Sequence, residues 1–137
     1  MRDEKRVLFV CRYNRLRSIL AEGFFNKYNK NKNIKVKSAA PIKGRPLGTN
    51  VKKIAKKHKI KIKKHPDGLT SSLIAWQNIT VIVADDVPKS LFKKNIKYGK
   101  KVIWYKIKDA SSNDFDKVEL VSKNVEKKMK KLARKLR

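Results

Sequence analysis

The sequence predicts an α/β protein whose four-stranded parallel sheet carries helices on both faces. Short apolar runs alternate with amphipathic segments along all 137 residues, as in parallel sheets with right-handed crossovers. One run, Ile79–Ala84, is rich in β-branched residues and lacks polar alternation, which is typical of a strand covered on both faces. The length suits a substantial core, so we expect residues 1–137 to form a single domain.

The first half of the chain is predicted to alternate strand and helix. The apolar run Arg6–Val10 predicts a buried strand, Ile19–Phe25 predicts the helix after it, and the alternating Ile34–Ser38 predicts a half-buried strand. Cap residues and apolar spacing then predict two helices. The first is capped by Thr49 or Asn50, and its shared face consists of Val51, Ile54, Ala55 and His58. The second is short, follows Thr70 and Ser71, and contains Leu73, Ile74 and Trp76.

The second half is predicted to end in a long helix. After the third strand at Ile79–Ala84, Pro88 suits the first turn of a helix that carries Leu91 and Phe92. Lys101–Tyr105 is the fourth strand. Apolar residues that recur every three or four positions predict an amphipathic C-terminal helix, and they are Phe115, Val118, Val121, Val125, Met129, Leu132 and Leu136.

The only cysteine of the chain, Cys11, lies between the first strand and the first helix. Amides of a loop that curls into a helix start can converge on a dianion, and their field favours a nucleophilic thiolate beneath it. Arg17 can grip two phosphate oxygens in a bidentate fork. This layout predicts a phosphate-binding loop after the first strand, formed by Arg12, Tyr13, Asn14, Arg15, Leu16, Arg17 and Ser18. The alternative is an inert buried cysteine at a strand end.

Here the chain resembles the low-molecular-weight protein tyrosine phosphatases and the thioredoxin-coupled arsenate reductases that share their fold. The family pattern is roughly Val-Cys-x-Gly-Asn-x-x-Arg-Ser-Pro followed by Met-Ala-Glu. The chain departs from it at Tyr13, where the family has glycine, and at Ile19, where it usually has proline. The residues that match are Val10, Cys11, Asn14, Arg17, Ser18, Ala21 and Glu22.

The resemblance implies a set of residues that support the loop. The family holds its loop asparagine in a left-handed conformation through two serines and a histidine, which correspond to Asn14, Ser18, Ser38 and His65. His65 equally suits an ordinary surface histidine, because lysines precede it. Asp85 follows the third strand at a matching acidic position, where we expect it to bond loop amides rather than to act in catalysis.

The resemblance also implies a general acid on the loop after the fourth strand. Asp109 occupies that place, although the proline that usually follows the family's acid is absent. Asp114 and Asp116 are interpreted as helix-start residues that favour the dipole. The family's aromatic residues after the acid are also missing, and the candidates to replace that wall are Tyr13, Trp76 and Tyr105.

The resemblance therefore implies a cysteine-dependent phosphomonoesterase that acts through a cysteinyl-phosphate without metal or cofactor. Cys11 is the expected nucleophile, Arg17 the phosphate ligand and Asp109 the acid. The expected substrates are phosphorylated proteins, above all phosphotyrosine, or small phosphomonoesters. The alternative is a weakly active or inactive phosphate- or polyanion-binding protein of the same fold. Arsenate reduction through a disulfide relay requires additional cysteines, which the chain lacks.

The composition is strongly basic, with 38 Lys and Arg against 11 Asp and Glu and a net charge of +27. Such a charge predicts weak electrostatic binding to nucleic acid or anionic surfaces. The alternative is a lysine-rich codon bias that places the charges on solvated helix faces. No apolar run reaches the roughly 20 residues of a membrane span, and the N-terminus lacks a signal-peptide core. A cytoplasmic location is therefore expected.

Overall fold

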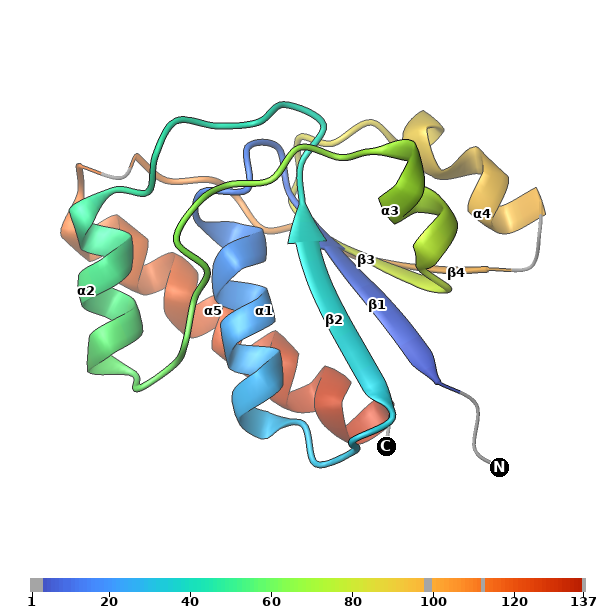
Figure 1. The fold of residues 1–137 in the computed structure, drawn as a ribbon. Coiled ribbons are helices and arrows are strands. Elements are labelled where there is room, and N and C mark those ends of the chain that lie inside the picture. Colours follow the sequence, from blue (N-terminus) through green and yellow to red (C-terminus); the bar gives the residue numbers. More distant parts are fainter. Residues whose placement is uncertain (1–3, 98–99, 112, 137) are drawn as a thin grey trace.

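The computed structural model describes residues 4–97, 100–111 and 113–136. Its centre is a sheet of four parallel strands in the order β2-β1-β3-β4. The four-stranded parallel sheet predicted from the sequence is therefore confirmed (Figure 1). The strands are β1 (Lys5–Val10), β2 (Ile34–Ala39), β3 (Ile79–Val83) and β4 (Lys101–Tyr105).

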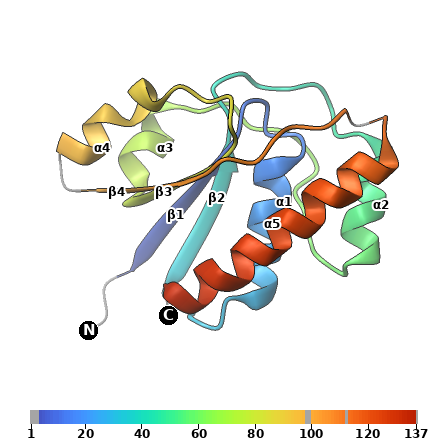
Figure 2. The ribbon, with the colours of Figure 1, turned by 180° about the vertical axis from the view of Figure 1, so that it is seen from behind.

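The helices lie on both sides of this sheet. Helices α1 and α5 pack together on one side, α3 and α4 lie on the other, and α2 packs against α5 (Figures 1 and 2). A 3₁₀ turn, η1, leads into α4. The bounds are α1 (Arg17–Tyr28), α2 (Thr49–Lys57), α3 (Ser71–Trp76), η1 (Lys89–Phe92), α4 (Lys93–Lys97) and α5 (Phe115–Lys135).

The central strands and α1 form the core of the molecule. Strand β3 is buried along its whole length, which matches its unbroken apolar run. Helix α1 is not amphipathic, because the sheet covers one side of it and α5 another. Helix α5, in contrast, buries a single stripe that contains Val118, Val125, Met129 and Leu132. Burial of these apolar side chains is the main source of stability.

Some helix boundaries differ from the prediction. Helix α2 is preceded by Gly48 in an extended conformation and begins at Thr49, so the prediction of Thr49 or Asn50 as its cap was wrong. His58 follows the last residue of α2, where its ring meets the edge of Phe24. Pro88 has an extended ψ of 130° and precedes η1 rather than lying in its first turn. These differences are local and leave the order of the elements unchanged.

Among residues 4–97, 100–111 and 113–136, no helix is long and apolar enough to cross a membrane.

Candidate active site

The loop between β1 and α1 surrounds the thiol of Cys11. Cys11 is buried, with 2% of its surface exposed. Its Sγ lies 2.9 Å from the Ser18 hydroxyl oxygen, and the Asn14 amide donates a hydrogen bond to Sγ over 3.3 Å. Both groups can donate a hydrogen bond to this sulfur.

Asn14 holds the loop in its curled shape. Its φ of 53° lies in the left-handed region, which asparagine tolerates better than most residues. The Asn14 side-chain amide donates to the Ser18 hydroxyl over 2.6 Å, and its carbonyl accepts from the backbone N–H of Asp67 over 2.8 Å. Asn14 is fully buried, so these bonds also satisfy a polar group that would be costly to leave unpaired.

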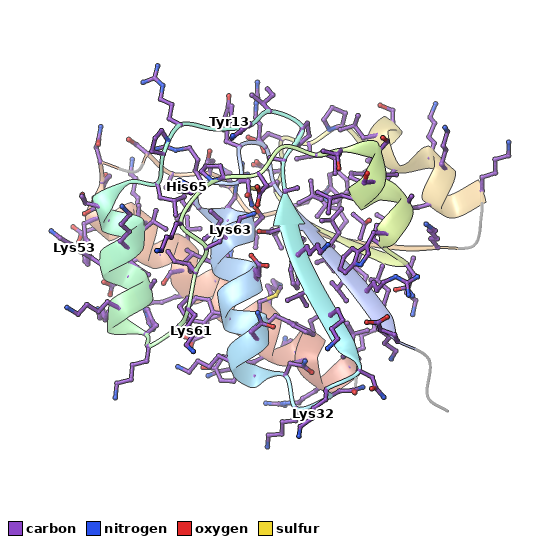
Figure 3. The ribbon with its side chains drawn as sticks, in the orientation of Figure 1. Tyr13, Lys32, Lys53, Lys61, Lys63 and His65 are labelled. Carbon is purple, nitrogen blue, oxygen red and sulfur yellow. The ribbon has the colours of Figure 1, made fainter. Side chains whose placement is uncertain are left out.

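Two residues expected to support Asn14 lie elsewhere. The Ser38 hydroxyl donates to Glu22 over 2.8 Å instead, and burial raises the pKa of Glu22 above its ordinary value. The His65 side chain is exposed, on the segment that passes in front of α1 (Figure 3). The backbone N–H of Asp67, and not a histidine side chain, donates to the Asn14 side-chain carbonyl. A backbone donor of this kind cannot be recognised from the residue types in a sequence.

A long connection, residues 40–48, arches over the loop (Figure 1). The amides of Ile42 and Gly44 donate to the carbonyls of Arg12 and Tyr13 over 3.3 Å and 3.0 Å. The Arg15 guanidinium donates to the Pro46 carbonyl through Nε and Nη2, over 3.3 Å and 3.0 Å. The carbonyls of Arg12 and Tyr13 are thus satisfied from outside, which leaves the interior of the loop free for an anion.

Several donors of the loop are unpaired. Within the described part of the chain, the backbone amides of Tyr13, Arg15 and Leu16 have no hydrogen-bond partner. The Arg17 Nε is buried and likewise lacks a partner there. A buried unpaired donor such as this Nε is rare in proteins, and a bound oxyanion can accept from it and from the loop amides together.

Arg17 is surrounded by acidic side chains. Its side chain is only 1% exposed, and Nη1 donates to the Ile107 carbonyl over 2.9 Å. Nη2 lies 2.9 Å from Asp86 Oδ1 and 3.6 Å from Asp109 Oδ2, and Nη1 lies 3.5 Å from Asp85 Oδ1. Asp85, expected to bond loop amides, thus faces the guanidinium. The sequence reasoning missed Asp86, although its position directly after Asp85 at the end of β3 could have revealed it.

Asp109 lies at the rim of a small cavity above Cys11. The cavity has a volume of about 40 Å³, enough for a group larger than one water molecule, such as a phosphoryl group. Asp109 accepts from the Ala110 amide over 2.9 Å and is 39% exposed. The structure thus brings the three residues expected to carry the chemistry to one cavity, whose lining is Cys11, Tyr13, Arg15, Leu16, Arg17, Asp109 and Ala110.

The other acids of this region have structural contacts. Asp114 is the N-cap of α5 and accepts from the Lys117 amide over 3.2 Å, and Asp116 lies in the first turn. Their interpretation as helix-start residues is confirmed. The described residues contain no group of three or more His, Cys, Asp or Glu side chains arranged to hold a metal ion.

A wider hollow of about 570 Å³ opens outward from the small cavity, and the two share Tyr13, Arg15, Asp109 and Ala110. We call this outer hollow the mouth of the cavity. Tyr13 lines it and lies near the top of the molecule in Figure 3. Trp76 and Tyr105 are not among the described residues that line either hollow, and they contact Lys37 and Lys128 instead. Of the three aromatic candidates, Tyr13 is therefore the one among the described residues that lines these hollows.

Solved structures share this architecture. A low molecular weight protein tyrosine phosphatase from T. tengcongensis is 24% identical, with a TM-score of 0.83 over 96% of this chain and 99% of that one. An arsenate reductase from Archaeoglobus fulgidus is 25% identical, with a TM-score of 0.72 over 93% and 98%. The YwlE arginine phosphatase from Geobacillus stearothermophilus is 19% identical, with a TM-score of 0.82 over 96% and 92%. A comparison with curated proteins gives no significant match.

A comparison of the sequence with models of protein families identifies its family. Residues 6–137 match the profile described as low molecular weight phosphotyrosine protein phosphatase. The match contains β1 from Arg6 onward, the loop at Cys11, Asp109 and α5. Because it covers nearly the whole chain and agrees with the fold, this protein belongs to the low molecular weight phosphotyrosine protein phosphatase family.

Proposed function

We propose that this protein is a cysteine-dependent phosphomonoesterase and that phosphotyrosine is its leading substrate. The observation that carries the proposal is the shared cavity of about 40 Å³ that brings Cys11, Arg17 and Asp109 together. Its unpaired loop amides and the Arg17 Nε supply donors for a phosphoryl dianion. The proposed partners are phosphorylated proteins or small phosphomonoesters.

In the first step the Cys11 thiolate attacks phosphorus. An S–P bond forms while the P–O bond to the leaving group breaks, and loop amides and Arg17 stabilise the charge on the equatorial oxygens. Asp109 gives its proton to the departing oxygen. The Asp109 position at the cavity rim, 39% exposed, lets it reach a leaving group that points outward.

In the second step water hydrolyses the cysteinyl-phosphate. Asp109, now a carboxylate, accepts a proton from the attacking water, and the S–P bond breaks to release phosphate and the thiolate. Ser18 stabilises that thiolate, since its hydroxyl oxygen is 2.9 Å from Sγ. Amides and the guanidinium provide the charge stabilisation, so the proposed mechanism uses no cofactor. A reducing compartment such as the cytoplasm keeps this thiol active.

Tyr13 supports an aromatic substrate. It is half-buried at the junction of the two hollows, where the ring of phosphotyrosine would pass. An aromatic side chain there offers stacking, which is worth about 0.5–1.5 kcal/mol beyond burial. Tyr13 thus replaces the aromatic wall that residues 110–113 do not provide.

The single cysteine argues against arsenate reduction through an intramolecular disulfide relay. The other alternative, a weakly active binding protein, rests on Tyr13 in the loop and on the missing proline after Asp109. Turnover separates this alternative from the proposal, because both predict phosphate binding.

The test compares wild type with Cys11→Ser on p-nitrophenyl phosphate in the presence of a chelator. We expect wild type to turn over and the variant to lose turnover, while isothermal titration still detects phosphate binding by both. Ser90→Ala, an exposed change on η1, serves as a control that retains activity. Phosphate binding without wild-type turnover would favour the binding protein, and wild-type-like turnover by Cys11→Ser would exclude the covalent mechanism.

A further inference from the structure

Two arginines line the outer hollow without a carboxylate partner. Arg15 and Arg45 both border it, and neither forms an ion pair with any residue that the structure describes. Asp109 is the one acid among the described lining residues, and its carboxylate lies 3.6 Å from Arg17. The mouth of the cavity therefore carries uncompensated positive charge beside a phosphate-sized site.

Arg15 is held in place rather than free in solvent. Its guanidinium is bonded to the Pro46 carbonyl, and its stem lies against the backbone at Gly44. A Cβ at Gly44 would lie 2.5 Å from Arg15 Cγ and 2.7 Å from the Tyr13 carbonyl oxygen. Only a residue without a side chain allows this approach, so residues 40–48 fix one cation at the mouth.

We infer that this mouth selects phosphorylated peptides that carry an acidic residue next to the phosphorylated one. The inference rests on the proposed function, because a phosphoryl group in the inner cavity places its flanking groups in the outer hollow. The two hollows are continuous through Tyr13 and Arg15. Arg15 and Arg45 then face a second negative charge on the substrate, which a guanidinium binds through paired donors.

The dimensions favour a peptide over a small bisphosphate. The outer hollow measures about 570 Å³ against about 40 Å³ for the inner cavity, which is room for a side chain with its backbone. Ser111 and Asn113 also line it and offer hydrogen bonds to peptide groups. Tyr13 contributes apolar surface between the two charged regions.

The net charge of +27 attracts every anion, so a test must separate the mouth from the rest of the surface. Lys43 is a matched control for Arg45. It lies two residues away on the same connection and is exposed, but it does not line the hollow. Its Cβ is directed to Gly68 instead, 3.7 Å from the position that a Cβ there would take.

The experiment measures kcat/KM for two phosphotyrosine peptides that differ only in glutamate or glutamine at the flanking positions. We expect wild type to prefer the acidic peptide by about five-fold at low salt, the scale of exposed charge pairs. The preference should fall toward unity near about 0.5 M NaCl. Arg45→Gln should lower this ratio by about two- to three-fold, whereas Lys43→Gln should leave it unchanged.

Equal losses in the two variants would assign the preference to net charge and overturn the inference. An absent preference, or faster turnover of a small bisphosphate than of either peptide, would overturn it as well. Binding of both peptides to Cys11→Ser, measured by fluorescence anisotropy, keeps the two proposals separate. Selective binding without wild-type turnover of p-nitrophenyl phosphate would contradict the proposed function alone. Turnover without selectivity would contradict only the inference.

Discussion

Asp86 holds the guanidinium of Arg17 from the side of β3: its Oδ1 lies 2.9 Å from Arg17 Nη2, and its Oδ2 accepts from the same nitrogen over 3.2 Å. Arg17 is almost fully buried, so its charge needs a partner whether or not an anion is bound. Asp85 and Asp109 lie farther away, at 3.5 Å and 3.6 Å. Asp86 is therefore the main counter-charge of Arg17 when no anion is bound.

Replacement of Asp86 should make the fold depend on phosphate. We expect Asp86→Asn to lower the free energy of unfolding by roughly 1–3 kcal/mol, the cost of a buried polar group left poorly satisfied. Phosphate should restore part of that loss, because the dianion supplies the missing negative charge to Arg17. Urea unfolding with and without inorganic phosphate measures both quantities.

The control for this prediction is Asp116→Asn, which removes an exposed carboxylate from the first turn of α5. Phosphate should stabilise that variant no more than wild type. A phosphate-induced gain in Asp86→Asn that does not exceed the wild-type gain would show that Asp86 is not the counter-charge.

Gly44 is predicted to be essential for residues 40–48 to pack closely over the loop at Cys11. Gly44→Ala places a Cβ 2.5 Å from Arg15 Cγ and 2.7 Å from a backbone oxygen, so the connection must move away. We expect an overpacking cost of about 1–3 kcal/mol and weaker phosphate binding by titration calorimetry. Gly68→Ala is the matched control, since its nearest contact would be an ordinary 3.7 Å to Lys43 Cβ. Equal stability of the two variants would contradict the prediction.

The pattern of the sequence was sufficient to predict the sheet, its neighbouring helices and the edge of the sheet at which the candidate site lies. The unbroken run at β3 and the strand before Cys11 determine where parallel strands end, and ligands bind at that edge. Asp109 is far from Cys11 and Arg17 in sequence, but it follows β4 whereas they follow β1 of the same parallel sheet, so the topology brings it to their edge.

The finer support of the site could not be predicted in the same way. The donor to the Asn14 carbonyl is the backbone of Asp67, and any residue at that position carries the same N–H. Ser38 bonds Glu22 rather than Asn14, because the partner of a hydroxyl depends on side-chain geometry that sequence spacing does not encode. Gly44 is important only because residues 40–48 pass over Arg15, a contact between segments distant in sequence.

Glu22 gives a prediction on pH. Burial raises the pKa of Glu22 above its ordinary value of 4.5, so the folded state retains a proton that the unfolded state releases. The free energy of unfolding of wild type, relative to Glu22→Gln, should fall as pH rises from 4.5 to the raised pKa and then level off. Urea unfolding of both proteins from about pH 4 to about pH 7 measures this difference. A difference independent of pH would contradict it.

Glu119 provides a control in which the free energy of unfolding should change with pH in the opposite direction. A hydrogen bond from Lys57 lowers the pKa of Glu119, so that carboxylate stabilises the fold above its ordinary pKa of 4.5 and loses this effect as pH falls through the lowered value. Relative to Glu119→Gln, wild type should therefore gain stability as pH rises.

The basic surface leads to a prediction on nucleic acid. Exposed lysines project from α2, from the segment after it and from the connection between α1 and β2, as Lys53, Lys61 and Lys32 show in Figure 3. Such scattered charge predicts weak binding of a labelled DNA duplex, equal for unrelated sequences and lost between about 50 and 200 mM salt. Fluorescence anisotropy measures it. Binding that persists at higher salt or prefers one sequence would support a dedicated nucleic-acid role.

Asp109 carries the last prediction, which tests the acid in the proposed mechanism. Asp109→Asn should slow hydrolysis of phosphotyrosine by roughly 10²–10⁴-fold, the usual contribution of acid–base catalysis. Esters whose leaving group is already a stable anion need less protonation, so their cysteinyl-phosphate should still form quickly and a pre-steady-state burst should appear. Water attack would remain slow, because the same carboxylate acts as the base. Asp116→Asn, exposed on α5, is the control expected to match wild type. Equal rates for Asp109→Asn and wild type across a leaving-group series would remove Asp109 from the mechanism and make Asp85 or Asp86, the other carboxylates near Arg17, the next candidates.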